Sequence, residues 1–267
     1  MKLAATSLFT TINLFGFFIF TWPLFLNTES LGLASLNQAT WLAALFGTLC
    51  LVIITLQINA KLLDSKIVAI VAVLVALISA LRLLGAGAVG IEPMWFLIIL
   101  AARALGSQVG FIIALLAILV SSLITGGIGP WLPFQALAAG WIAAAVAIIP
   151  KNLSQRIERV ALMAYGIFAA LFFGTLMDLQ LWPWLLGSDT QLSYIPGAGV
   201  AENFGRFLTF HFATALSWDI PRAIITASLI FMTAKPVLTA LKRAKYRLDS
   251  VSDWRVTNEL GPVEKVA

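Results

Sequence analysis

Charged residues are scarce in this sequence. Asp, Glu, Lys and Arg make up 11% of its 267 residues, whereas hydrophobic residues make up 61%. Soluble domains usually carry about 25% charged and about 45–50% apolar residues. The composition therefore excludes an ordinary soluble domain and predicts an integral membrane protein. At roughly 20 residues per transmembrane helix, the chain has room for about seven to nine helices and for no separate soluble catalytic domain.

Residues suited to metal, redox or nucleophilic chemistry are equally scarce. The chain has one cysteine, Cys50, inside an apolar run, and one histidine, His211. It contains no nucleotide-binding P-loop, no HExxH metal motif, no G-x-S-x-G nucleophile motif and no acid-rich DDxxD motif. The apolar runs also lack the chain of buried acids that ion-driven pumps use. We therefore expect no metal site, no cofactor and no enzymatic activity.

Eight apolar segments are candidate membrane spans, and together they predict an all-α polytopic membrane protein. They are Leu8–Leu26, Trp41–Leu56, Ile67–Leu81, Pro93–Leu105, Val109–Thr125, Leu132–Ile149, Ala161–Leu181 and Leu216–Ala234. Lys and Arg concentrate in alternate connections and in the C-terminal tail. Because such residues mark the cytoplasmic side, we expect a multi-pass protein of the cell membrane with both termini in the cytoplasm. The excess of basic residues then reports orientation and not nucleic-acid binding.

Three further segments carry expectations of their own. Pro93–Leu105 is short for a span, so neighbouring helices must shield its ends. Lys151–Arg159 is polar with apolar positions four apart, which predicts a short helix lying at the cytoplasmic interface. Trp182–Ala215 is a connection of 34 residues with several glycines, which predicts a long outer loop of the kind that forms lids or binding loops.

Alanines recur on one face of the third apolar segment. Ala69, Ala72, Ala76 and Ala80 are spaced by three, four and four residues, which places them on one side of a helix. Small residues let membrane helices approach closely. The stripe therefore indicates either packing inside this bundle or a docking face for a separate membrane subunit, and the sequence leaves both open.

Polar and aromatic residues collect on the expected outer side. Tryptophan is enriched at membrane interfaces in general, but ionisable residues near membrane depth are costly and therefore informative. Structural ion pairs and ligand contacts are both open interpretations. An aromatic-rich cavity with few charges suits a bulky, largely apolar ligand. The candidate ligand-binding residues are Arg82, Glu92, Trp95, Trp131, Phe134, Gln135, Asp178, Trp182, Trp184, Asp219 and Arg222.

Several of these segments resemble a known family, the S components of energy-coupling factor (ECF) vitamin transporters. The resemblance rests on the alanine spacing, on GAGAVGIEPMWFLIILAARALGSQVGF, on SLITGGIGPWLPFQALAAGW, on the WPW at 182–184 and on WDIPRA at 218–223. It covers about two thirds of the chain, and GPWLPFQ is its most specific part. Among subtypes, the chain is most similar to the cobalamin-type S components.

The resemblance implies a substrate-binding subunit of an ATP-driven importer for a vitamin or related micronutrient. It implies a six-helix substrate-binding core, here residues 67–248, preceded by two extra helices in residues 1–66 and followed by a cytoplasmic tail, 249–267. Ligand would bind at the outer loops, and the face with Ala72, Ala76 and Ala80 would contact a transmembrane coupling subunit that carries two cytoplasmic ATPases. The two extra N-terminal helices depart from the family pattern.

A different class of function stays open beside this one. A small intramembrane enzyme acting on a lipid or isoprenoid substrate could use Glu92, Asp178, Asp219 and Arg222 as its polar site. The absence of a DDxxD motif argues against the commonest chemistry of that kind.

Overall fold

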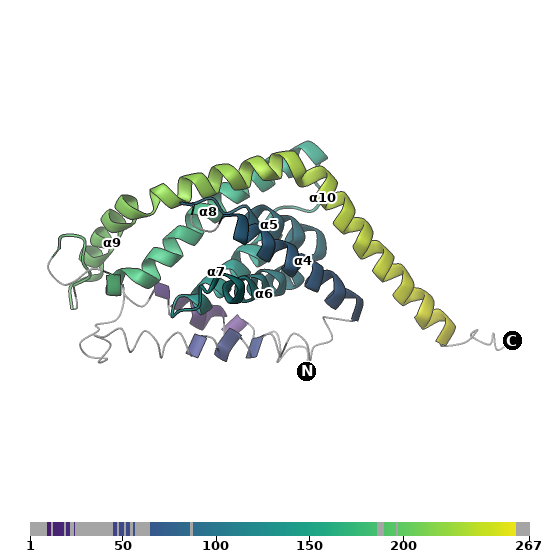
Figure 1. The fold of residues 1–267 in the computed structure, drawn as a ribbon, viewed down its shortest axis with the longest axis horizontal. Coiled ribbons are helices and arrows are strands. Elements are labelled where there is room, and N and C mark those ends of the chain that lie inside the picture. The colour runs from purple at the N-terminus through teal and green to yellow at the C-terminus, as the bar shows by residue number, and fades with distance from the viewer. Residues whose placement is uncertain are drawn as a thin grey trace.

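A computed structural model describes the backbone of residues 65–85, 88–185, 190–195 and 197–259, together with scattered positions between 10 and 56. Within the four continuous ranges, side chains are described up to residue 247, except at 65, 66, 184 and 185. Every regular element in these residues is helical (Figure 1). In order they are α4 (Ser65–Leu84), α5 (Met94–Leu105), α6 (Ser107–Thr125), α7 (Leu132–Ala145), the short 3-10 helix η1 (Val146–Ile148), α8 (Gln155–Leu185), α9 (Val200–Thr214) and α10 (Leu216–Glu259).

The membrane character predicted from composition is confirmed at the level of helix length and hydropathy. α4, α6, α8 and α10 are each long and apolar enough to cross a membrane, and α5 and α7 are shorter apolar helices. α5 has only 12 residues, and ten of them are buried. The neighbours of α5 therefore shield it, as its short length required. The count of eight spans goes beyond this finding.

The two N-terminal candidate spans lie partly outside the described residues, and of the tail 249–267 the backbone is described as far as Glu259, the end of α10. Among the N-terminal positions that are described, Phe20 and Phe46 are fully buried. Their rings pack on Phe134 of α7, with centroids 5.1 and 4.6 Å away. Trp141, two turns further along α7, donates a hydrogen bond from Nε1 to the Asn13 side chain (2.5 Å). The N-terminal segment thus contacts α7 through aromatic packing.

Glycines set the turns and the closest approaches between helices. Gly106 separates α5 from α6 at φ 109°, a conformation that a side chain disfavours, and the two helices fold back on each other there. A Cβ at Gly110 would collide with the backbone of Ala102 on α5. α6 ends at Gly126 in the left-handed conformation, and Gly127 N–H donates to the Ser122 carbonyl (3.0 Å).

Two expectations about the connections were wrong. Lys151–Arg159 is not a separate interfacial helix, because α8 begins at Gln155 and continues without a break to Leu185. Trp182–Ala215 is not an irregular loop, because it contains the last turn of α8 and all of α9, a 15-residue amphipathic helix. Ala215 alone separates α9 from α10, and its N–H still donates to the His211 carbonyl (2.8 Å).

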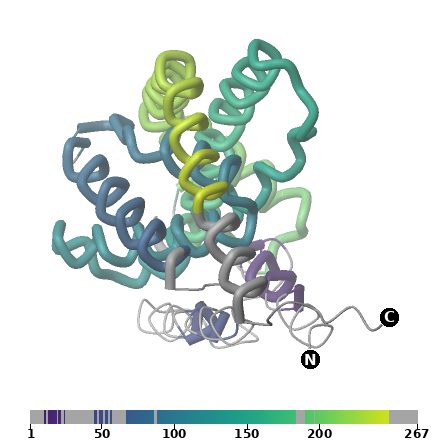
Figure 2. Tube along the Cα trace, turned by 90° about the vertical axis from the view of Figure 1, so that its right-hand side faces the viewer, coloured from purple at the N-terminus to yellow at the C-terminus, as the bar shows by residue number. Residues whose placement is uncertain are grey.

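α10 is the longest helix, and it has two parts. Its first part lies side by side with α8. Beyond the bend visible in Figure 1, its second part leaves α8 and passes the end of α5, where Leu238 is buried and Lys245 donates to the Leu105 carbonyl (3.4 Å). In Figure 2 this second part, in yellow, lies in front of the bundle. Pro236 lies inside the helix, and a proline removes a backbone hydrogen bond and favours such a bend. We call residues 237–247 the basic arm, since they contain Lys242, Arg243, Lys245 and Arg247.

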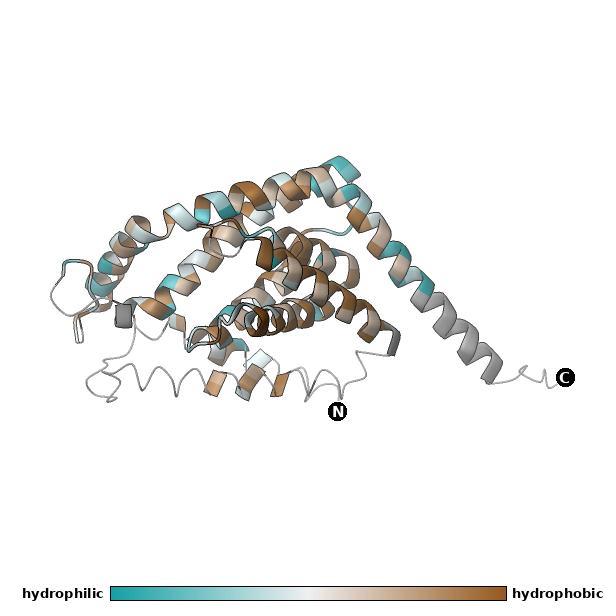
Figure 3. Cartoon of the chain, viewed as in Figure 1, coloured by the Kyte–Doolittle hydropathy of each residue, from teal (hydrophilic) through white to brown (hydrophobic). Residues whose placement is uncertain are grey.

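Hydropathy divides the molecule accordingly. Brown, hydrophobic residues dominate α4 and the central helices in Figure 3, whereas teal, hydrophilic residues gather near the bend of α10 and along the basic arm. Polar groups also collect at the opposite end of the bundle, where α4, α6 and α8 end and α5, α7 and α10 begin. We call this the polar end, and the end with the basic arm the basic end.

Candidate functional site

The polar end brings together side chains from seven helices, α4 to α10, that are far apart in sequence. They form three hydrogen-bonded groups, centred on Arg82, on Arg222 and on Asp178. Each group links two or more helices, so each one both fixes the helix ends and presents polar atoms within an apolar bundle.

Arg82, in the last turn of α4, is held entirely by neutral acceptors. Its guanidinium donates to the hydroxyls of Ser121 (2.8 Å) and Ser122 (2.9 Å), to the Ile118 carbonyl (3.2 Å) and to Gln135 Oε1 (3.0 Å). The two serines end α6, and Gln135 begins α7. The hydrogen bonds of this half-buried cation all go to neutral groups, and the charge of Glu92 acts on it without a hydrogen bond. The guanidinium therefore suits an anionic or polar group of a ligand.

Arg222, in the second turn of α10, is paired with two acids. Its Nε donates to Glu92 Oε2 (2.9 Å) and its Nη1 to Asp219 Oδ1 (2.6 Å). Nη1 also approaches the Ala170 carbonyl of α8 (3.3 Å). Glu92 Oε2 in turn accepts the Trp95 indole N–H (2.5 Å). This group therefore ties the α4–α5 connection, α8 and α10 together.

Small residues make room for the Arg222 group. A Cβ at Gly174 of α8 would collide with the carboxylate of Asp219, so this carboxylate lies directly against the α8 backbone. The Arg222 guanidinium also lies over the ring of Phe173, with its carbon 5.1 Å from the ring centroid. Asp219 is 1% exposed, and its Oδ2 has no hydrogen-bond partner among the described residues.

Glu92 lies in the connection between α4 and α5, where its charge is stabilised by its neighbours. Burial by itself would raise the pKa of this carboxyl group. The charge and hydrogen bond of Arg222, the Trp95 hydrogen bond and the charge of Arg82 act in the opposite direction and hold the pKa of Glu92 below its usual value. Glu92 is therefore ionised at neutral pH and is a fixed negative charge at the polar end.

The third group joins α8 to α9. His211 Nδ1 lies 2.9 Å from Asp178 Oδ2, and Thr214 donates to the same carboxylate oxygen (3.2 Å). On its other side, His211 Nε2 lies 3.3 Å from the Thr175 hydroxyl. Both Asp178 and Thr175 belong to α8, so these contacts fasten α9 along its C-terminal half.

A small second core holds the other half of α9. Trp182 is fully buried, donates from Nε1 to the Leu192 carbonyl (2.7 Å), and packs edge-on against Tyr194 and Phe207. Asn203 is buried and bonds both the N–H and the carbonyl of Ile195 through its amide. The segment that the sequence analysis treated as a loop is therefore a packed cap on α8.

The candidate aromatics divide between the interior and the surface. Trp95 is 1% exposed and lies against Phe173, whereas Trp131, just before α7, is 39% exposed and covers Gly129. Phe134 is buried against the N-terminal phenylalanines and not against the polar groups. The side chain of Trp184 lies outside the described residues. Of the three aromatics whose side chains are described, Trp131 is the one that is exposed.

The structure thus brings together Glu92, Trp95, Asp219 and Arg222 in one group and Arg82 with Gln135 in another. Sequence reasoning missed four polar partners: Ser121, Ser122, Thr175 and Thr214. It mentioned His211 but did not select it. The adjacent serines at the end of an otherwise apolar helix were the signal available for Ser121 and Ser122, since polar residues at such depth need partners.

The alanine stripe lies on an open face of α4. Ala72, Ala76 and Ala80 are all exposed, while Val71, Val75 and Ile78 on the opposite side of the helix are buried in the core. Within the described residues, the stripe is therefore not covered by another helix of the bundle, which favours the second of the two interpretations that the sequence left open.

Comparison with known proteins gives no relative. No family model, no curated protein and no solved structure matches this chain.

Proposed function

We propose that the chain is the substrate-binding membrane subunit of an ATP-driven, ECF-type importer for a vitamin or related micronutrient, with cobalamin as the first ligand to test. The observation that carries the proposal is the gathering of polar groups from seven helices at one end of an apolar bundle. This arrangement is typical of a site that binds a ligand from one side of a membrane. The proposal places the polar end on the outer face.

The ligand site that we propose lies around Arg82, Gln135 and Trp131. Arg82 and Gln135 offer directional hydrogen bonds, and the half-exposed Trp131 offers an aromatic face. The Arg222 group and the α9 cap act as the rigid support, since their buried hydrogen bonds and ion pairs join α8 to α9, to α10 and to the α4–α5 connection. A bulky ligand with apolar surface and a few polar groups fits such a combination.

The exposed alanines support the second half of the proposal. Ala72, Ala76 and Ala80 leave a smooth strip on α4 where another membrane helix can approach closely. In the proposed importer this strip docks on the coupling subunit, which connects it to two cytoplasmic ATPases. The chain itself supplies no chemistry, and ATP hydrolysis takes place on the partners.

The test is the visible absorption spectrum of the purified protein after incubation with cobalamin and removal of free ligand. We expect about one cobalamin per chain, and we expect Gln135→Ala to lower the affinity about tenfold through the lost hydrogen bond to Arg82 and to the ligand. Gln108→Ala, an exposed glutamine at the start of α6, is the matched control and should bind normally. If the two variants bind cobalamin with equal affinity, Gln135 does not belong to the ligand site. A colourless wild-type protein would exclude cobalamin, and co-purified small molecules identified by mass spectrometry would then test other vitamins.

One observation supports a second candidate, an intramembrane enzyme. Thr175, His211 and Asp178 follow the order hydroxyl, imidazole, carboxylate that activated nucleophiles use, with contacts of 3.3 and 2.9 Å. The Thr175 hydroxyl, however, donates its proton to the Leu171 carbonyl (2.9 Å), as a structural threonine does. Labelling by a hydroxyl-directed fluorophosphonate that depends on His211 would support the enzyme, and an unlabelled protein would speak against it.

A further inference from the structure

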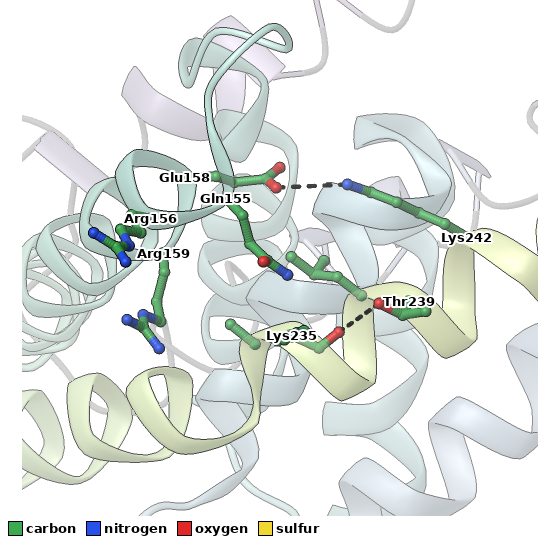
Figure 4. A pocket seen from close by; sticks show the side chains of 9 residues that line it. Gln155, Arg156, Glu158, Arg159, Lys235, Thr239 and Lys242 are labelled. Atoms are coloured by element: carbon green, nitrogen blue, oxygen red, sulfur yellow. Dashed lines mark hydrogen bonds and ion pairs between the residues drawn. The ribbon is translucent and has the colours of Figure 1, made fainter.

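A cavity of about 240 Å³ opens at the basic end, between the first turns of α8 and the part of α10 around its proline bend. Its lining combines charged and polar side chains from both helices: Gln155, Arg156, Glu158, Arg159, Lys235, Thr239 and Lys242 (Figure 4). Figure 4 shows Arg156 and Arg159 side by side on one flank, the Gln155 side chain in the middle and Lys242 on the other flank. Four cationic side chains and a single acid therefore surround the cavity.

The single acid is already neutralised. Glu158 binds Arg103 of α5 through Oε1 (2.7 Å) and Lys242 through Oε2 (3.6 Å), and Arg103 also donates to the Ile149 and Pro150 carbonyls. Arg156, Arg159 and Lys235 have no acidic partner within the described part of the chain. The cavity thus carries uncompensated positive charge, to which the N-terminus of the 31-residue α8 adds its partial positive charge.

Apolar side chains next to the cavity face outward. On α8, Ile157 is 57% and Val160 is 63% exposed, and on α10, Phe231 and Met232 are exposed as well. The Arg159 guanidinium lies over the Phe231 ring, 4.8 Å from its centroid, so the cation stands directly beside this apolar surface. In a membrane protein such exposed side chains contact acyl chains, and the charged cavity then lies at the depth of lipid phosphates.

We propose that this cavity binds the phosphate-bearing headgroup of an anionic phospholipid. The lipid phosphate would lie between Arg156, Arg159 and Lys235, the Gln155 amide would bond a headgroup hydroxyl, and the acyl chains would extend over Val160 and Met232. A general excess of basic residues on the cytoplasmic side attracts anionic lipids without a cavity. The shaped cavity, the saturated acid and the adjoining apolar surface distinguish a specific site from that background. The proposal depends only on membrane embedding and not on the transport function.

The experiment measures lipid binding to the full-length protein in detergent by native mass spectrometry. The probes are dihexanoyl phosphatidylglycerol and dihexanoyl phosphatidylcholine, which share acyl chains and differ in headgroup charge. We expect tighter binding of the phosphatidylglycerol. Removing one cation near an anionic lipid should weaken binding about fivefold. The double variant R156Q/R159Q should therefore lose roughly twentyfold or more in phosphatidylglycerol affinity.

The matched control is R243Q/R247Q, which removes the same charge from the basic arm outside this cavity. We expect its affinity to change less than about threefold, and the single exposed variant K235Q gives a second test if the arginine variant folds poorly. Equal losses in the two double variants would show a diffuse surface effect and overturn the proposal. Equal binding of the two lipids would also overturn the proposal. Complete displacement of the lipid by inorganic phosphate would overturn it as well, because the cavity would then be a site for free phosphate.

Discussion

Arg222 is the residue whose removal should affect stability most. Its side chain is 5% exposed and holds two acids, the 1% exposed Asp219 and the 26% exposed Glu92. Removing one partner of a buried ion pair costs about 3–5 kcal/mol because the remaining charge stays buried without compensation. Glu92 is partly exposed and keeps the hydrogen bond from the Trp95 N–H, so most of the cost comes from Asp219. We therefore expect Arg222→Gln to lower the free energy of unfolding by about 3 kcal/mol, the low end of that range.

The assay is reversible unfolding in mixed micelles of dodecyl maltoside and sodium dodecyl sulfate, followed by circular dichroism. Arg206→Gln is the control, because Arg206 also pairs with a carboxylate, that of Glu202 (3.2 Å), but at the surface. Exposed ion pairs contribute about 0–1 kcal/mol, so this variant should change little.

A second substitution tests the assigned cause. If buried Asp219 carries the cost, the double variant R222Q/D219N should recover at least half of the lost stability, since an amide needs no counter-charge. R222Q/E92Q should recover less, because Glu92 is partly solvated. Losses of equal size in Arg222→Gln and Arg206→Gln, or no recovery with D219N, would refute the reasoning.

Three further predictions concern other parts of the chain. Ala76→Leu should leave folding and ligand binding intact but abolish co-purification with the proposed coupling subunit. Ala164→Leu, at an exposed alanine of α8, is the control and should still co-purify with that subunit. If both variants co-purify, the α4 stripe is not the docking face. Gly110→Ala should lower the free energy of unfolding by about 1–3 kcal/mol, because the added Cβ overpacks against α5. Gly205→Ala in α9 is the control: a Cβ there meets no other atom, so the variant should be neutral or slightly stabilised in the same micelle assay. Because Arg222 lowers the pKa of Glu92 in the folded state, Glu92 stabilises the fold above its unfolded pKa of about 4.5, and this stabilisation is lost as pH falls through the lower folded value. Thermal midpoints of wild type and Glu92→Gln should therefore differ at pH 6 and converge towards pH 3, and a constant difference would contradict the pKa shift.

Local composition was enough to locate most helices. The predicted span Val109–Thr125 corresponds to α6 at Ser107–Thr125, and Pro93–Leu105 corresponds to α5 at Met94–Leu105. An apolar run bounded by glycine or proline has few alternatives in a membrane, since its backbone must satisfy its own hydrogen bonds. The same reasoning failed at Val200–Thr214, because α9 is amphipathic and preceded by Gly199. Only its packing on α8 through Trp182 and His211 makes it a cap.

The sequence by itself determined that this is an apolar, helical membrane protein, and it singled out most of the ionisable residues at the polar end, because their cost in an apolar run is visible without coordinates. Only the tertiary structure decided their partners. Arg222 meets Glu92 across 130 residues, and Arg82 meets Gln135 across 53, because helix ends distant in sequence converge at one end of the bundle. It also decided that the alanines of α4 face outward, since hydropathy gives a helix's position in the chain but not which of two apolar faces its neighbours cover.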